Sequence, residues 1–138
     1  MHITIAPTSP KTGRATVRAL LDSLPSTSED GTPVRVTGIY RNLDKVPKEF
    51  LADPRFRAVQ GDVEDAASLD FSDTDALLTI TPPFYLSRSA QAVLEGAKQV
   101  SLNVKDAIVR AEGRVRRVVL VSSMGAQYEN GTVSQRSM

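Results

Sequence analysis

Apolar and polar residues follow one another along this chain in a pattern that predicts five short β-strands. The predicted strands cover residues 3–6, 34–40, 56–60, 76–80 and 118–121. The first two alternate between apolar and polar positions, which is the period of a strand. The runs at 76–80 and 118–121 are apolar at nearly every position, so we expect strands that are buried on both faces.

Helical periodicity appears between these runs. Residues 12–23 are predicted to form a helix whose apolar face carries Val17, Leu20 and Leu21. Residues 48–52 are predicted to form a short helix, and residues 66–69 a helical turn.

The longest predicted helix begins at residue 87 or 89 and ends at residue 112, with Gly113 as its C-cap. Its apolar residues recur at alternating steps of four and three, at Val93, Ala97, Val100, Val104, Ala107 and Ala111. This spacing predicts one continuous apolar stripe along the helix.

Strands that alternate with helices indicate an α/β fold with a parallel sheet and right-handed crossovers. We expect a single domain over residues 1–138, a doubly wound Rossmann-like fold with five strands in the order 3-2-1-4-5. Strands 1, 4 and 5 are predicted to form the centre of the sheet. Their buried residues are expected to be Ile3, Ile5, Leu78, Ile80, Val119 and Val121.

Composition and charge exclude several classes of function. The chain has 138 residues, a net charge of +1, no cysteine and the single histidine His2. These values favour neither a nucleic-acid surface nor a membrane surface, and they exclude disulfides, thiolate metal sites and a histidine cluster. No apolar run approaches the roughly 20 residues of a membrane span, so we expect a cytoplasmic protein.

The first candidate site is the turn between the first strand and the first helix, where a dinucleotide-binding fold holds a pyrophosphate. Glycines spaced as in short-chain dehydrogenases would stand at positions 7, 10 and 13, but the chain has Pro7, Pro10 and Gly13. Gly13 would let the helix lie close to the strand, whereas Pro10 removes an N–H that could bind phosphate. The polar residues that could compensate are Ser9, Lys11 and Thr12. The alternative is an ordinary strand–turn–helix connection without a ligand.

The residues after the second strand bear on the choice of cofactor. An acid at this position would bind the ribose 2′-hydroxyl of NAD, but this chain has Arg41 and Asn42, with Lys45 nearby. Because a guanidinium suits a phosphate, Arg41 predicts a preference for NADP over NAD. The alternative is an arginine in an exposed loop.

Three further strand ends carry candidates. Asp62, which precedes Val63, could accept a hydrogen bond from the adenine amino group, or Gly61 and Asp62 could simply form a turn. Thr81 and Pro82 could line the ribose, or only terminate the fourth strand. Ser123 follows the fifth strand, where short-chain dehydrogenases place a catalytic serine; the alternative is a structural cap.

Taken together, the ordered segments at residues 5–13, 40–42, 60–63, 78–83 and 118–127 resemble the NmrA-like branch of atypical short-chain dehydrogenases. The most distinctive are Thr-Pro-Pro after the fourth strand and Ser-Ser-Met-Gly-Ala after the fifth. The resemblance implies an NAD(P)-binding Rossmann domain. It implies cofactor contacts at Ser9, Lys11, Thr12, Arg41, Asp62, Val63, Thr81 and Pro82.

Members of that family are longer, because further strands and a C-terminal lobe close their substrate pocket. We therefore interpret the chain as the N-terminal half of such a protein, with its C-terminal lobe missing. The fifth strand would then be an unprotected edge unless another segment or a partner covers it.

Three hypotheses about function remain. The first is the cofactor half of an oxidoreductase that acts on a small molecule, as some family members do in fungal secondary metabolism. The second is a non-catalytic NADP-sensing module that works through a regulatory protein partner, and the third is a degenerate fragment that binds nothing. The catalytic Tyr-x-x-x-Lys dyad is absent, because Tyr128 is followed four residues later by Thr132.

Overall fold

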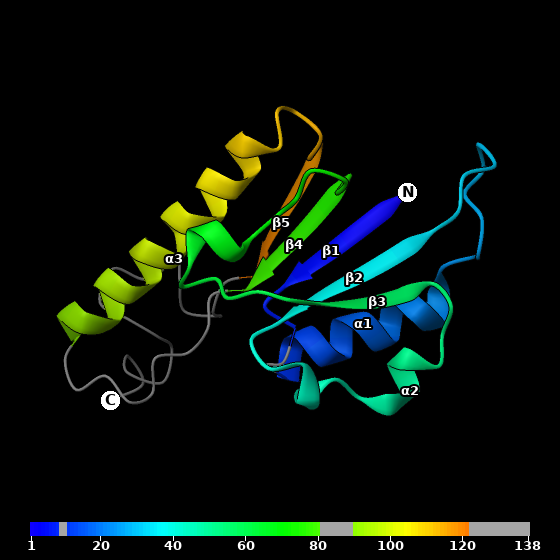
Figure 1. Cartoon of the computed structure of the whole chain (residues 1–138), viewed down its shortest axis with the longest axis horizontal. Coiled ribbons are helices and arrows are strands. Elements are labelled where there is room, and N and C mark those ends of the chain that lie inside the picture. Colours follow the sequence, from blue (N-terminus) through cyan, green and yellow to red (C-terminus); the bar gives the residue numbers. More distant parts are fainter. Residues whose placement is uncertain (9–10, 81–89, 122–138) are drawn as a thin grey trace, which may run out of the picture.

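The computed structural model describes residues 1–8, 11–80 and 90–121, which form a five-stranded parallel sheet (Figure 1). The strand order is β3-β2-β1-β4-β5, and every pair of neighbours is parallel. The strands are β1 (His2–Ala6), β2 (Arg35–Tyr40), β3 (Phe56–Gln60), β4 (Ala76–Ile80) and β5 (Arg117–Val121). The predicted fold class and strand order are confirmed.

Helices cover both faces of the sheet. Residues of α1 (Lys11–Ser23) and α2 (Lys48–Leu51) pack in one apolar cluster, and residues of α3 (Ala90–Arg110) pack in another. Figure 1 shows α1 and α2 on one side of the strands and α3 on the other. Two 3₁₀ helices, Leu43–Lys45 and Ala66–Ser68, follow β2 and β3.

The cluster beneath α1 and α2 depends on the apolar faces that the sequence pattern predicts. Ile5 and Val17 are fully buried in it, and the rings of Phe50 and Phe56 lie 5.5 Å apart at a tilted angle. Burying an apolar side chain of this size contributes about 1.5–3 kcal/mol. This cluster fixes α1 and α2 against one face of the sheet.

The cluster beneath α3 confirms most of the predicted stripe. Val100, Val104, Ala107 and Ala111 are buried in contact with residues of β1, β2 and β4. Between them on the same helix, the Asn103 amide donates a hydrogen bond of 3.0 Å to the Val63 carbonyl. The stripe therefore also fixes the segment that follows β3.

The C-terminal end of α3 differs from the prediction by two residues. The helix ends at Arg110 rather than at residue 112. The left-handed conformations of Glu112 (φ 53°) and Gly113 (φ 83°) end it, so Gly113 has the backbone conformation expected of a C-cap glycine. The predicted start of this helix, at residue 87 or 89, lies outside the described residues.

The predicted position of strand 5 at the sheet centre is wrong. In the described part of the chain β5 pairs with β4 alone, whereas β1, β2 and β4 each have two neighbours. Ile5 and Ile80 are buried as predicted, and Ile3, Leu78 and Val121 are partly buried. Val119 is 55% exposed, because α1 and α2 pack over the other strands of that face.

The exposed apolar residues of β5 are Val118, Val119 and Leu120, which lie on both of its faces. An apolar run of this kind is compatible with a strand buried on both faces, but here it belongs to the outer strand of the sheet.

No helix in the described ranges is both long and apolar enough to cross a membrane.

Candidate functional site

The carboxyl ends of the parallel strands lie side by side and form the C-terminal edge of the sheet, which runs across the strands. Ile5 of β1 is in register with Gly38 of β2 and Leu78 of β4, and Gly38 is in register with Ala58 of β3. The segments that leave β1, β2 and β3 therefore start at the same level. In a doubly wound sheet this is the edge at which ligands bind.

The turn after β1 is tied to β2 through Thr8, which is fully buried. The Thr8 N–H donates a hydrogen bond of 2.9 Å to the Ile39 carbonyl, and its hydroxyl donates one of 2.7 Å to the Ile5 carbonyl. The preceding Ala6–Pro7 peptide bond is cis. Thr8 lies within the turn that the sequence predicts as a candidate site, and its hydrogen bonds hold that turn in place.

Helix α1 approaches this turn closely at Gly13, as the third position of the glycine pattern predicts. A Cβ atom at Gly13 would lie 2.7 Å from the Thr8 carbonyl oxygen and 2.9 Å from the Pro7 carbonyl oxygen. Both contacts are with backbone atoms, so a side chain would require the helix or the turn to move. The next residues of α1 in either direction, Thr12 and Arg14, are exposed.

A second glycine contributes to the same close packing from β2. A Cβ atom at Gly38 would lie 2.8 Å from Cε2 of Tyr40 and 3.0 Å from the Thr8 hydroxyl oxygen. The Tyr40 ring is buried in the cluster beneath α1, and its hydroxyl has no hydrogen-bond partner among the described residues. Burial raises the pKa of Tyr40 to about 12, and the positive charge of Arg14 partly opposes this shift.

Arg41, the predicted 2′-phosphate ligand, lies at the end of β2 with its side chain 71% exposed. Its Nε is 3.7 Å from Oδ2 of Asp62, and its Nη1 is 3.8 Å from Oε2 of Glu64. The structure therefore brings together two predicted residues, Arg41 and Asp62. It adds Glu64, which the sequence reasoning missed because nothing in the local pattern indicates where its side chain lies.

Asn42 and Asp62 also have local structural roles. The Asn42 Oδ1 accepts a hydrogen bond of 2.9 Å from the Asp44 N–H and caps the 3₁₀ helix Leu43–Lys45. The Asp62 Oδ1 accepts one of 2.9 Å from the Glu64 N–H, and the Asp62 N–H donates one of 2.9 Å to the Ser68 hydroxyl. The turn chemistry considered as an alternative for Asp62 is therefore present, together with its ion pair.

Val63 does not lie at the rim of the site. Its side chain is 3% exposed and packs in the cluster beneath α3, and its carbonyl accepts the hydrogen bond from Asn103. A neighbouring ligand would meet the backbone of this residue rather than its side chain.

The other predicted site residues divide into two groups. Lys11 and Thr12 are exposed in the first turn of α1, next to the turn that follows β1. Ser9, Thr81, Pro82 and Ser123 lie outside the described residues, as does Pro10. Within the described ranges, no group of three or more His, Asp or Glu side chains could hold a metal ion.

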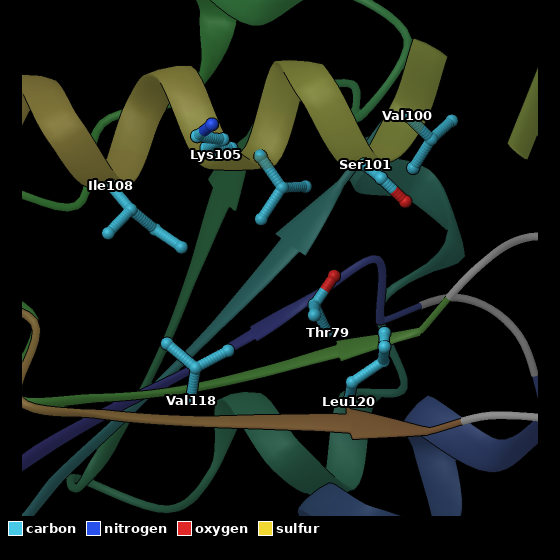
Figure 2. A pocket seen from close by; sticks show the side chains of 8 residues that line it. Thr79, Val100, Ser101, Lys105, Ile108, Val118 and Leu120 are labelled. Atoms are coloured by element: carbon cyan, nitrogen blue, oxygen red, sulfur yellow. The ribbon is translucent and has the colours of Figure 1, made fainter. Parts of the chain in front are cut away.

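An apolar hollow of about 200 Å³ lies elsewhere, between α3 and the strands β4 and β5 (Figure 2). Figure 2 shows side chains of α3 pointing towards those of the two strands. The lining residues are Thr79, Val100, Ser101, Val104, Lys105, Ile108, Val118 and Leu120. Among the described residues that line the hollow, Lys105 is the single charged one, so this part of the chain does not supply there the paired phosphate-binding groups expected of the cofactor site.

Comparison with known proteins agrees with this geometry. A sequence family described as NAD(P)H-binding matches residues 9–137, which is nearly the whole chain. No curated protein matches the chain significantly.

Solved structures with the same fold are NAD(P)-linked enzymes of greater length. A triphenylmethane reductase from Citrobacter sp. is 21% identical in sequence, with a TM-score of 0.63. The match covers 89% of this chain and 37% of the reductase. An NADPH-dependent quinone oxidoreductase from Escherichia coli, complexed with NADPH, is 19% identical with a TM-score of 0.56, again with 89% and 37% coverage. A dTDP-glucose 4,6-dehydratase from Streptomyces venezuelae with NAD bound is 24% identical with a TM-score of 0.66, with 89% and 39% coverage.

We predict that Gly13→Ala destabilises the fold. Alanine is favoured over glycine in a helix by about 1 kcal/mol. The added Cβ would meet backbone oxygen at 2.7 Å, and overpacking of this kind typically costs about 1–3 kcal/mol. We therefore expect a lower free energy of unfolding in urea, with Arg14→Ala at the exposed neighbouring position as the control. A variant as stable as the parent would show that α1 moves away from the turn without cost.

The raised pKa of Tyr40 predicts that the folded chain loses stability at alkaline pH. Its pKa is about 12 in the folded chain and has an ordinary value of about 10 in the unfolded chain. The contribution of the neutral phenol is therefore complete below pH 10 and is lost as the pH rises through 12. Urea unfolding at a series of pH values should show a steeper fall for the parent chain than for Tyr40→Phe. Equal slopes would contradict this assignment.

Proposed function

Because the chain belongs to the NAD(P)H-binding family, we propose that this domain binds NADP(H) in preference to NAD(H). The observation that carries the proposal is Arg41, an exposed cation directly after β2, where NAD-specific domains place an acid. A guanidinium pairs well with a phosphate, and the 2′-phosphate is what distinguishes NADP from NAD.

The residues that would hold the rest of the cofactor fit this proposal in two respects. Gly13 leaves no room for a side chain between α1 and the turn after β1, as the third glycine position of the fingerprint requires. Lys11 and Thr12 offer a positive charge and a hydroxyl in the first turn of α1, whose N-terminus favours anions. When bound, NADPH would supply a hydride.

We propose further that the chain is the cofactor-binding part of an NmrA-like cytoplasmic oxidoreductase that acts on a small molecule, as in secondary metabolism. Two of the structural neighbours are named as reductases or oxidoreductases, but this chain spans less than two-fifths of their length. The second candidate is a non-catalytic NADP-sensing module with a regulatory protein partner. In its favour, the one tyrosine after β5 within these 138 residues, Tyr128, is followed four residues later by Thr132 rather than by lysine.

Replacing Arg41 with alanine tests the cofactor preference. Losing a charged contact with the 2′-phosphate should weaken NADP binding about 10- to 100-fold, while NAD binding stays nearly unchanged. Calorimetric titration of both cofactors against both variants measures this. Arg35→Ala, at the opposite end of β2, is the matched control. Equal losses for NADP and NAD in the Arg41 variant would count against the proposal.

A turnover assay tests whether this chain is catalytic on its own. General acid assistance is typically worth about 10²–10⁴ in rate, so a chain without the tyrosine–lysine pair should not oxidise NADPH with carbonyl substrates. The assay follows NADPH absorbance with a panel of aldehydes and ketones. Substrate-dependent oxidation that Ser123→Ala abolishes would show that the chain is catalytic and that Ser123 takes part.

A further inference from the structure

We propose that Glu64 sets the strength of the cofactor preference by competing with the 2′-phosphate for Arg41. This inference rests on the proposed function, since it concerns the same arginine. It assigns a specificity-determining role to a residue outside the dinucleotide fingerprint. The Arg41 guanidinium lies 3.8 Å from the Glu64 carboxylate and 3.7 Å from the Asp62 carboxylate, and both acids follow β3.

These two ion pairs are of the kind that a ligand can replace. Both separations exceed an ordinary hydrogen bond, and the side chains of Arg41 and Glu64 are 71% and 51% exposed. Exposed pairs of this kind typically contribute about 0–1 kcal/mol. A phosphate monoester carries a charge of about −1.5 to −2 and three acceptor oxygens, so it is a stronger partner for the guanidinium than one carboxylate.

The local charge also opposes the same phosphate. Two carboxylates face one guanidinium here, so the group made of Arg41, Asp62 and Glu64 has a formal charge of −1. NAD has a neutral hydroxyl in place of the 2′-phosphate and is indifferent to this charge. The carboxylates therefore lower the affinity for NADP more than the affinity for NAD.

Of the two acids, Glu64 is the one whose carboxylate takes part in no hydrogen bond of the loop among the described residues. Asp62 holds the turn, because its Oδ1 accepts the Glu64 N–H and its own N–H donates to Ser68. The Glu64 carboxylate has its one recorded contact within the described residues with Arg41. Glutamine at position 64 keeps the shape of the side chain and removes the charge.

The test uses two probes that differ only in the 2′-phosphate, namely adenosine 2′,5′-bisphosphate and adenosine 5′-monophosphate. Both are titrated against the parent chain, Glu64→Gln, Arg41→Ala and the double variant. Glu64→Gln should tighten the bisphosphate about 3- to 10-fold and change the monophosphate less than about 2-fold. With Arg41 replaced, the same substitution should give a smaller gain, because the competition for the guanidinium is gone and only the repulsion between the Glu64 carboxylate and the phosphate remains.

Glu49→Gln is the matched control, since Glu49 is also an exposed glutamate paired with an arginine, Arg18, but lies on α2. It should change neither probe. Equal effects of Glu64→Gln on both probes, or a gain that persists in full without Arg41, would overturn the inference. If Arg41→Ala weakens the bisphosphate but Glu64→Gln has no effect, the inference fails and the proposed function stands. If the parent chain does not discriminate between the probes and Glu64→Gln does not create discrimination, both fail.

Discussion

The close packing of α1 against the turn after β1 is the constraint on which the candidate site depends. Gly13 and Gly38 leave no space for a Cβ atom on either side of this turn, and the buried Thr8 ties it to β1 and β2 through two hydrogen bonds. Since protein interiors are packed as densely as organic crystals, none of these parts can move independently. The position of the α1 N-terminus relative to Arg41 therefore follows from two glycines and one threonine.

Arg55 holds the opposite end of α1 in place. Its guanidinium donates hydrogen bonds to the carbonyls of Leu21 and Leu24, at and just beyond the end of the helix, and to the carboxylate of Asp53. The hydrogen bonds that Arg55 donates to the Asp53 carboxylate hold the pKa of this carboxyl below its ordinary value. Because Arg55 directly precedes β3, this network joins the last turn of α1 to the strand that leads to Asp62 and Glu64. The described candidate residues of the site thus lie within residues 11–64, and α1 is held at both of its ends.

How far the sequence predicts the structure depends on the range of the interactions involved. The strand order was predictable because strands that alternate with helices favour a doubly wound parallel sheet. The stripe on α3 was predictable because apolar periodicity reports directly which face must be buried. Gly13 was predictable for a similar reason, since it belongs to a short motif. The burial of Val119 was predicted wrongly, because an apolar strand has the same sequence pattern whether or not a further element covers it. Glu64 was missed, as was the Tyr40 hydroxyl, which has no hydrogen-bond partner in the described part of the chain, because their surroundings come from segments distant in the sequence.

The charges around Arg41 follow from the same difference between local and long-range interactions. The turn after β3 needs an acceptor for the Glu64 N–H, and here an aspartate, Asp62, provides it and also places one negative charge beside Arg41. The charge of Glu64 is not required by any hydrogen bond of that turn. Stability and cofactor discrimination therefore make separate demands on two neighbouring acids. A chain that needed stronger selection for a 2′-phosphate could lose the carboxylate at position 64 and keep its fold, whereas losing the side-chain acceptor at position 62 would cost it the turn.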